Sequence, residues 1–135
     1  MALKLKKGIK QLVADAYKEI ETLQARDAIP LKDDPNVVLV DLRDVRELAR
    51  DGRIPGAFHA PRGMLEFWVD PESPYYKNIF GTGKKFVFFC AGGLRSALAT
   101  QAVQQMGLEP VCHIEGGFRA WKEAGGPVEM EKPKA

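Results

Sequence analysis

A short apolar run at residues 86–89 is followed by a glycine-containing loop and then by a helical pattern, and this succession constrains the fold most. The run Phe-Val-Phe-Phe is typical of a strand that is buried on both faces. The pattern from Ser96 to Met106 predicts a helix that Gly107 ends. A second apolar run over Asn36–Leu42 predicts another buried strand. Buried strands that alternate with helices predict an α/β fold, a mainly parallel central sheet with helices on both faces.

An amphipathic helix is predicted within residues 1–19. Its apolar face is formed by Ile9, Leu12, Val13, Ala16, Tyr17 and Ile20. We expect this face to pack on the rest of the domain, with a dimer contact or a membrane surface as the alternatives.

Shorter elements are predicted in the middle and at the end of the chain. Asp44 and Glu47 have the spacing of a capping box, which predicts a helix that Gly52 ends. Residues 61–80 are the least regular part, with a helix expected over 62–69. The remaining predicted elements are strands over Lys85–Phe89 and Glu109–Ile114 and a last helix over Phe118–Ala124.

The loop after the first apolar run has the composition of a site for a reactive thiolate. Its residues are Cys90, Ala91, Gly92, Gly93, Leu94 and Arg95. Two glycines let the backbone curl so that several N–H groups point at one spot, and a helix N-terminus favours an anion there. Such surroundings lower a cysteine pKa from about 8.5 to roughly 3.5–7.5. We therefore predict Cys90 as a nucleophile, with residues 91–95 binding the substrate; a buried, inert cysteine is the alternative.

Three sequence positions are expected to meet at one rim of the sheet. Asp41, Cys90 and Gly116 each come just past the end of a predicted strand. In parallel sheets the carboxyl ends of the strands lie at the same edge, where ligands bind. Asp41 and Arg43 are expected to hold this rim in shape through charged hydrogen bonds.

The loop resembles the active-site loop of single-domain rhodaneses, whose common form is Cys-x-x-Gly-x-Arg followed by Ser. Four residues separate Cys90 from Arg95. In the related cysteine-dependent phosphatases and arsenate reductases five residues stand at this place and surround a tetrahedral oxyanion. The shorter loop suits a sulfur atom.

Further segments resemble the same family in the family's order. Residues 38–47 resemble its first signature, and 52–57 resemble its His-Ile-Pro-Gly-Ala turn with Arg53 in place of the histidine. Residues 116–121 resemble its closing Gly-Gly-x-x-Ala-Trp signature. The resemblance implies a rhodanese-like domain over residues 20–128, with a short strand near Ile20–Leu23. Residues 129–135 form a tail, which we expect to be frayed over Met130–Ala135.

The resemblance implies a sulfurtransferase that works through a persulfide on Cys90. Thiosulfate would be the small-molecule sulfur donor, and cyanide or a thiol, with thioredoxin or glutathione as candidates, the acceptor. Arg95 would hold the departing sulfite, Arg62 is a candidate second cation of the pocket, and no cofactor is implied. The alternatives are a phosphatase or arsenate reductase that uses the same cysteine, and a non-catalytic protein-interaction module.

Composition excludes several other function classes. The net charge of +2 and the lack of basic clusters interleaved with aromatics argue against nucleic acid. No apolar stretch approaches about 18 residues, so we expect no membrane span. His59 and His113 have no ligand spacing, so no metal site is expected, and Cys112 is expected to be a buried, inert thiol. A working thiolate needs a reducing compartment, which favours the cytoplasm.

Overall fold

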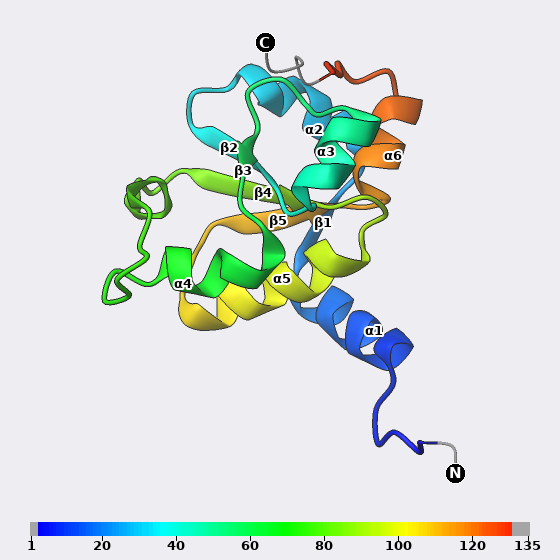
Figure 1. The fold of residues 1–135 in the computed structure, drawn as a ribbon, viewed down its shortest axis with the longest axis vertical. Helices are drawn as coiled ribbons and strands as arrows, with labels where there is room; N and C mark the ends of the chain where they lie inside the picture. Colours follow the sequence, from blue (N-terminus) through cyan, green and yellow to red (C-terminus); the bar gives the residue numbers. More distant parts are fainter. Residues whose placement is uncertain (1–2, 131–135) are drawn as a thin grey trace.

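One parallel sheet of five strands forms the centre of the computed structural model, which describes residues 3–130 (Figure 1). The strands are β1 (Glu21–Leu23), β2 (Val37–Asp41), β3 (Phe58–His59), β4 (Lys85–Phe89) and β5 (Val111–Ile114). Their order across the sheet is β1-β5-β4-β2-β3, and every neighbouring pair is parallel. The predicted α/β fold with a parallel central sheet is confirmed.

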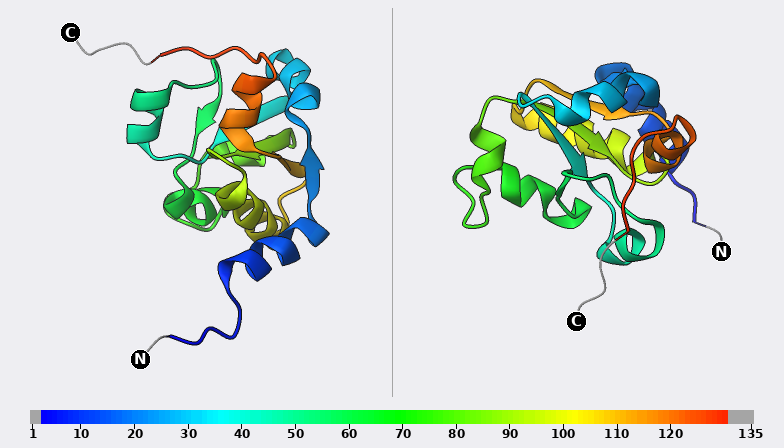
Figure 2. Two further views of the ribbon diagram at one scale, coloured as in Figure 1. Left: turned by 90° about the vertical axis from the view of Figure 1, so that its right-hand side faces the viewer. Right: turned by 90° about the horizontal axis from the view of Figure 1, so that it is seen from above.

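Helices cover both faces of this sheet (Figures 1 and 2). The α-helices are α1 (Ile9–Glu19), α2 (Ala25–Ala28), α3 (Val45–Asp51), α4 (Leu65–Val69), α5 (Leu94–Met106) and α6 (Gly117–Glu123). Three short 3₁₀ helices are η1 (Ile29–Asp33), η2 (Arg62–Met64) and η3 (Asn78–Gly81). Helices α4 and α5 lie on one face, α2 and α6 lie on the other, and α1 packs against α5.

The alternation of side chains along β4 explains why its sequence is apolar throughout. Phe86 and Phe88 point into the core beneath α4 and α5, where they meet Val103. Val87 and Phe89 point to the opposite face and belong to the core of α2 and α6. Because successive residues of a strand face opposite sides, a strand between two helical layers needs apolar residues at every position.

Several element boundaries differ from the sequence prediction. Helix α5 begins at Leu94, two residues before the predicted start at Ser96, so Arg95 lies in its first turn. Strand β5 begins at Val111 instead of Glu109. The helices over residues 25–33 and strand β3 were not predicted, because elements of two to five residues are too short to show a periodic pattern.

The ends of the described chain contact the domain differently. Near the N-terminus, α1 buries Ala16 completely against the domain. Near the C-terminus, the backbone of Glu129 exchanges hydrogen bonds with that of Arg53, at 2.8 and 2.9 Å. The first two residues of the predicted N-terminal segment and residues 131–135 of the predicted tail lie outside the described residues.

Candidate active site

The sulfur of Cys90 accepts hydrogen bonds from two backbone N–H groups of the loop that follows β4. The Gly93 and Ser96 backbone N–H groups donate to Cys90 Sγ at 3.2 and 3.4 Å, and Ser96 Oγ lies 3.7 Å from it. Cys90 is 1% exposed. Both N–H groups belong to the cap and first turn of α5, whose dipole favours an anion at this point. The arrangement therefore stabilises a negatively charged sulfur.

Two glycines allow the loop and the start of α6 to approach each other closely. Gly93 has φ +99°, and a Cβ there would lie 3.1 Å from the backbone nitrogen of Gly116. A Cβ on Gly117, which has φ +57°, would overlap the carbonyl oxygen of Cys90. That oxygen accepts a hydrogen bond from the Phe118 N–H at 2.8 Å. The Gly-Gly segment at the start of α6 thus supports the Cys90 loop directly.

Arg95 is held beside the loop by a carboxylate from α3. Its two terminal nitrogens donate to the Glu47 carboxylate at 2.8 and 2.9 Å, and its side chain is 42% exposed. Hydrogen bonding to Glu47 raises the pKa of Arg95, and Cys90 contributes in the same direction. Arg95 in turn lowers the pKa of Glu47, against the effect of burial. The bidentate pair fixes a permanent cation next to the sulfur.

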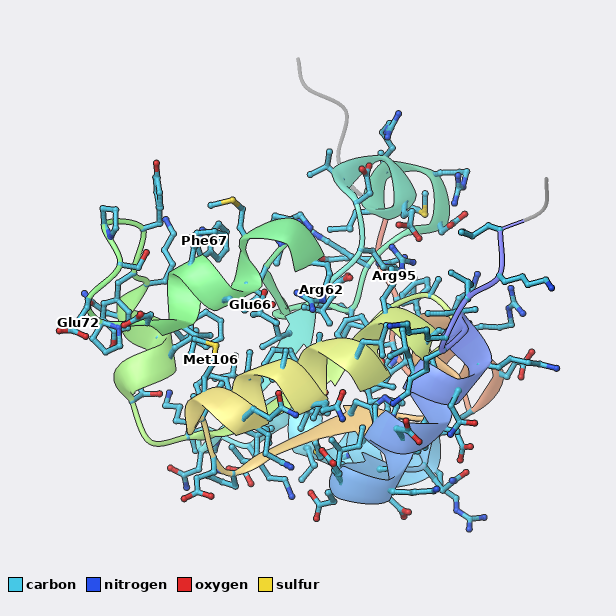
Figure 3. The ribbon with its side chains drawn as sticks, turned by 90° about the horizontal axis from the view of Figure 1, so that it is seen from below. Arg62, Glu66, Phe67, Glu72, Arg95 and Met106 are labelled. Carbon is cyan, nitrogen blue, oxygen red and sulfur yellow. The ribbon has the colours of Figure 1, made fainter. Side chains whose placement is uncertain are left out.

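Arg62 stands on the neighbouring η2 and is paired within its own segment. It donates to Glu66 at 2.7 Å, and its side chain is 32% exposed (Figure 3). This geometry joins Arg62 to α4. A role as second cation of the pocket stays a prediction.

Asp41 and Arg43 form a buried ion pair behind the loop. Arg43 Nη2 lies 2.8 Å from Asp41 Oδ2 and donates to the Gly52 carbonyl oxygen at the same distance. Its guanidinium lies 4.0 Å from the centre of the Phe118 ring. The pair thus connects the end of β2 with the end of α3 and with α6, and its role in supporting the site stays a prediction.

Of the other loop residues, Ala91 and Leu94 line two different pockets. Ala91 is half-buried and lines a cavity of about 380 Å³ with Arg43, Asp51, Phe118, Arg119, Lys122 and Glu123. Three of these side chains are cationic and two are acidic. Leu94 is exposed and lines a notch of about 160 Å³ with residues of α1. Gly92 is exposed at the tip of the loop.

A buried polar chain beneath the sulfur was not recognised from the sequence. Ser96 Oγ lies 3.0 Å from His113 Nδ1, and His113 Nε2 lies 3.2 Å from Thr22 Oγ1. The Tyr17 ring packs edge-on against the imidazole, with 4.9 Å between ring centres. His113 is fully buried, and this burial lowers its pKa to about 4. Its one signal in the sequence is a polar side chain within an otherwise apolar strand.

The remaining candidates take no part in this arrangement. Cys112 is fully buried in β5, and burial raises the pKa of its thiol to about 12. Among residues 3–130, no group of three or more His, Cys, Asp or Glu side chains is placed to hold a metal ion. In the same part of the chain no helix has the length and apolar character that a membrane crossing requires.

Comparisons with known proteins agree with this geometry. One solved structure is that of a Rhodopseudomonas palustris protein described as a possible tyrosine phosphatase. Its sequence is 59% identical to this chain and its TM-score is 0.92. The match covers 96% of this chain and 99% of that one. A polysulfide-sulfur transferase homodimer from Wolinella succinogenes is 30% identical with a TM-score of 0.68, and the match covers 90% and 87% of the two chains. A tRNA uridine(34) hydroxylase from Cronobacter sakazakii is 32% identical over 131 residues, which cover 91% of this chain.

The share of each relative that is matched differs widely. The chain spans 35–58% of the length of the first curated relatives that it matches. The rhodanese-like domain family matches residues 24–124, which include the Cys90 loop, the Asp41–Arg43 pair and the Gly116–Gly117 support. The chain belongs to the rhodanese-like domain family.

Proposed function

We propose that the protein is a sulfurtransferase that carries a sulfur atom as a persulfide on Cys90. The observation that carries the proposal is the pair of backbone N–H groups that donate to Cys90 Sγ, in a loop with only four residues between Cys90 and Arg95. Backbone N–H groups aimed at one sulfur stabilise a thiolate before transfer and a persulfide anion after it. Arg95, fixed by Glu47, supplies a cation for the oxygen atoms of an anionic donor.

The first half-reaction balances with thiosulfate as donor. The Cys90 thiolate attacks the outer sulfur, an S–S bond forms, and the bond between the two thiosulfate sulfur atoms breaks. Its electron pair leaves with sulfite, and Cys90 keeps a persulfide anion. A covalent intermediate of this kind divides one transfer into two easier steps.

The second half-reaction returns the thiolate. Cyanide or a thiolate attacks the terminal sulfur and leaves as thiocyanate or as a new persulfide. The cavity next to Ala91 presents the cations of Arg119 and Lys122 beside the carboxylates of Asp51 and Glu123, which supports a thiol that carries both charges, such as glutathione. A protein thiol such as that of thioredoxin is the alternative acceptor.

A phosphatase that uses the same cysteine is the second candidate. The observation in its favour is the 59% identity to a protein described as a possible tyrosine phosphatase. Four residues between Cys90 and Arg95 enclose less space than the five typical of phosphatase loops, which favours sulfur over phosphate. The activity in the name of the tRNA uridine(34) hydroxylase belongs to a protein of which this chain spans 36%.

Intact-protein mass spectrometry after brief incubation with thiosulfate tests the proposal. Wild type is expected to gain about 32 Da, one sulfur atom, and to lose it again on addition of cyanide. Cys90→Ser is expected to gain nothing, while Cys112→Ser serves as the matched control and gains the same mass as wild type.

Other outcomes discriminate among the candidates. An adduct on Cys112 instead of Cys90 would contradict the proposal. Turnover of p-nitrophenyl phosphate without any sulfur adduct would favour the phosphatase. A biological role that survives Cys90→Ser would favour a protein-interaction module.

A further inference from the structure

A series of polar side chains under the active-site sulfur runs without a gap from Thr22 on β1 to the Cys90 loop. Thr22 on β1, His113 on β5 and Ser96 on α5 form successive contacts of 3.2 and 3.0 Å, and the Cys90 thiol donates to Ser96 Oγ at 3.7 Å. His113 and Ser96 are both fully buried. A buried imidazole with hydrogen-bond partners at both nitrogens is fixed in orientation. This series of hydrogen bonds therefore links the orientation of the Thr22 hydroxyl to that of the Ser96 hydroxyl beside the sulfur.

The tautomer of His113 decides where the Ser96 hydroxyl proton goes. A neutral imidazole donates at one nitrogen and accepts at the other. If Nδ1 accepts, the Ser96 hydroxyl donates its proton to His113 and cannot donate it to the sulfur. If Nδ1 carries the proton, His113 donates to Ser96 Oγ. The Ser96 hydroxyl donates to the Gly93 carbonyl oxygen at 3.3 Å while the Cys90 thiol donates to Ser96 Oγ, and the hydroxyl proton can turn to the sulfur once the sulfur is a thiolate. Thr22 supports this second tautomer when its hydroxyl donates to Nε2.

We infer that His113 is a positioning residue that, through Ser96, turns a hydroxyl proton toward the Cys90 sulfur and stabilises its anionic form. The use of that anion in sulfur transfer rests on the proposed function, but the stabilisation itself does not. The imidazole stays neutral throughout, because burial lowers the pKa of His113 to about 4. The sulfur thus gains a hydrogen bond without a second charge beneath it.

Aromatic and charged side chains border the contacts among Thr22, His113 and Ser96. Tyr17 of α1 lies across the imidazole, and burial raises the pKa of the Tyr17 hydroxyl, with smaller contributions from Glu115 and Cys90. Arg95 on α5, paired with Glu47 on α3, is a charged neighbour of the Cys90 sulfur. Glu115 raises the pKa of His113 against the larger effect of burial. These groups are left unchanged in the variants below, so differences in the ionisation midpoint of Cys90 report on the hydrogen bonds among Thr22, His113 and Ser96.

A double-mutant cycle on the ionisation of Cys90 tests the inference. Thiolate ultraviolet absorbance is followed against pH in a Cys112→Ser background, with the Cys90→Ser/Cys112→Ser protein as blank. Ser96→Ala and His113→Phe are each expected to raise the midpoint by about one to two pH units, because the anion loses a hydrogen bond. In the Ser96→Ala background, His113→Phe is expected to add no further shift.

Two further variants separate positioning from packing. His113→Asn keeps a polar group near the position of Nδ1 and is expected to return the midpoint most of the way to wild type. Thr22→Val preserves shape but removes the donor to Nε2, so a smaller upward shift is expected, again absent in the Ser96→Ala background. Circular dichroism checks that each variant is folded. If His113→Phe does not fold, the Thr22→Val pair decides by itself.

The outcomes that overturn the inference differ from those that overturn the proposed function. A shift from His113→Phe or Thr22→Val that persists without the Ser96 hydroxyl would show an action that does not pass through Ser96. An unchanged ionisation midpoint of Cys90 in Ser96→Ala would show that the Ser96 hydroxyl does not stabilise the thiolate. The double-mutant cycle could give the expected shifts in a protein that gains no sulfur in the mass assay. That result would support the positioning role of His113 and reject sulfur transfer.

Discussion

The two adjacent glycines of the Cys90 loop differ in what their backbone requires. Gly93 has φ +99° and faces the Gly116 backbone, so an L-residue there meets strain as well as a close contact. Gly92 lies outside the left-handed region, and a Cβ on it would have no atom within 4 Å. Since Gly93 also donates the shortest contact to Cys90 Sγ, its conformation and the chemistry of the sulfur are linked.

Substituting each glycine by alanine separates these roles. Gly93→Ala is expected to destabilise the fold by about 1–2 kcal/mol, the cost of a left-handed conformation, and to reduce persulfide formation. Gly92→Ala, the matched control, is expected to keep both properties near wild type. Urea unfolding and the thiosulfate mass assay measure the two effects. Equal losses in both variants would contradict this assignment.

At the scale of elements, two helix starts bring together the charged groups of the site. The first turn of α5 presents Arg95, and the first turn of α3 presents Glu47. The capping box of α3 is complete: Asp44 accepts from the Arg46 N–H at 2.7 Å, and Glu47 accepts from the Asp44 N–H at 3.1 Å. Glu47 therefore serves the cap and the active-site arginine at once.

Removal of the cap should loosen α3. Asp44→Ala is expected to lower Tm by roughly 3–5 °C, because an orphan N–H of the first turn loses its acceptor. Asp51→Ala at the opposite end of the helix is the control, and a change of less than about 2 °C is expected since its pair with Arg50 is exposed. Thermal unfolding followed by circular dichroism compares them. A larger effect at Asp51 than at Asp44 would refute the role of the cap.

At the scale of the whole molecule, the burial of His113 depends on segments far apart in the chain. Tyr17 comes from α1, Thr22 from β1 and Ser96 from α5. In the unfolded chain the imidazole is exposed and has its ordinary pKa near 6.5. In the folded protein burial lowers that pKa to about 4. Global stability is therefore linked to the protonation of this residue.

The sign of the pH dependence follows from the two pKa values. Between about pH 6.5 and pH 4 the unfolded chain binds a proton that the folded protein does not, so the free energy of unfolding falls as the pH falls. Wild type is expected to lose roughly 2–3 kcal/mol more than His113→Asn between pH 7 and pH 4. Urea unfolding at several pH values gives the difference, in which the carboxylates common to both proteins cancel. Parallel pH profiles would show that His113 is not buried in the neutral form.

The sequence by itself was sufficient to predict the features that depend on neighbours along the chain. The apolar strand before Cys90, the glycine loop, the following helix and the capping box at Asp44 are all local patterns, and the structure contains each of them. The parallel sheet followed from the alternation of these patterns. That Asp41, Cys90 and Gly116 meet at one rim followed from the parallel direction of the strands.

Only the tertiary structure decided which distant side chains meet at the sulfur. Glu47 reaches Arg95 from 48 positions away, and His113 reaches Ser96 from 17 positions away. A histidine in an apolar strand has no local pattern that distinguishes it from other polar residues. Its partners are set by the register of β1 on β5 and by the packing of α1 and α5. Local sequence therefore built the loop and the backbone donors around Cys90, whereas long-range packing determined the partners of Arg95 and Ser96.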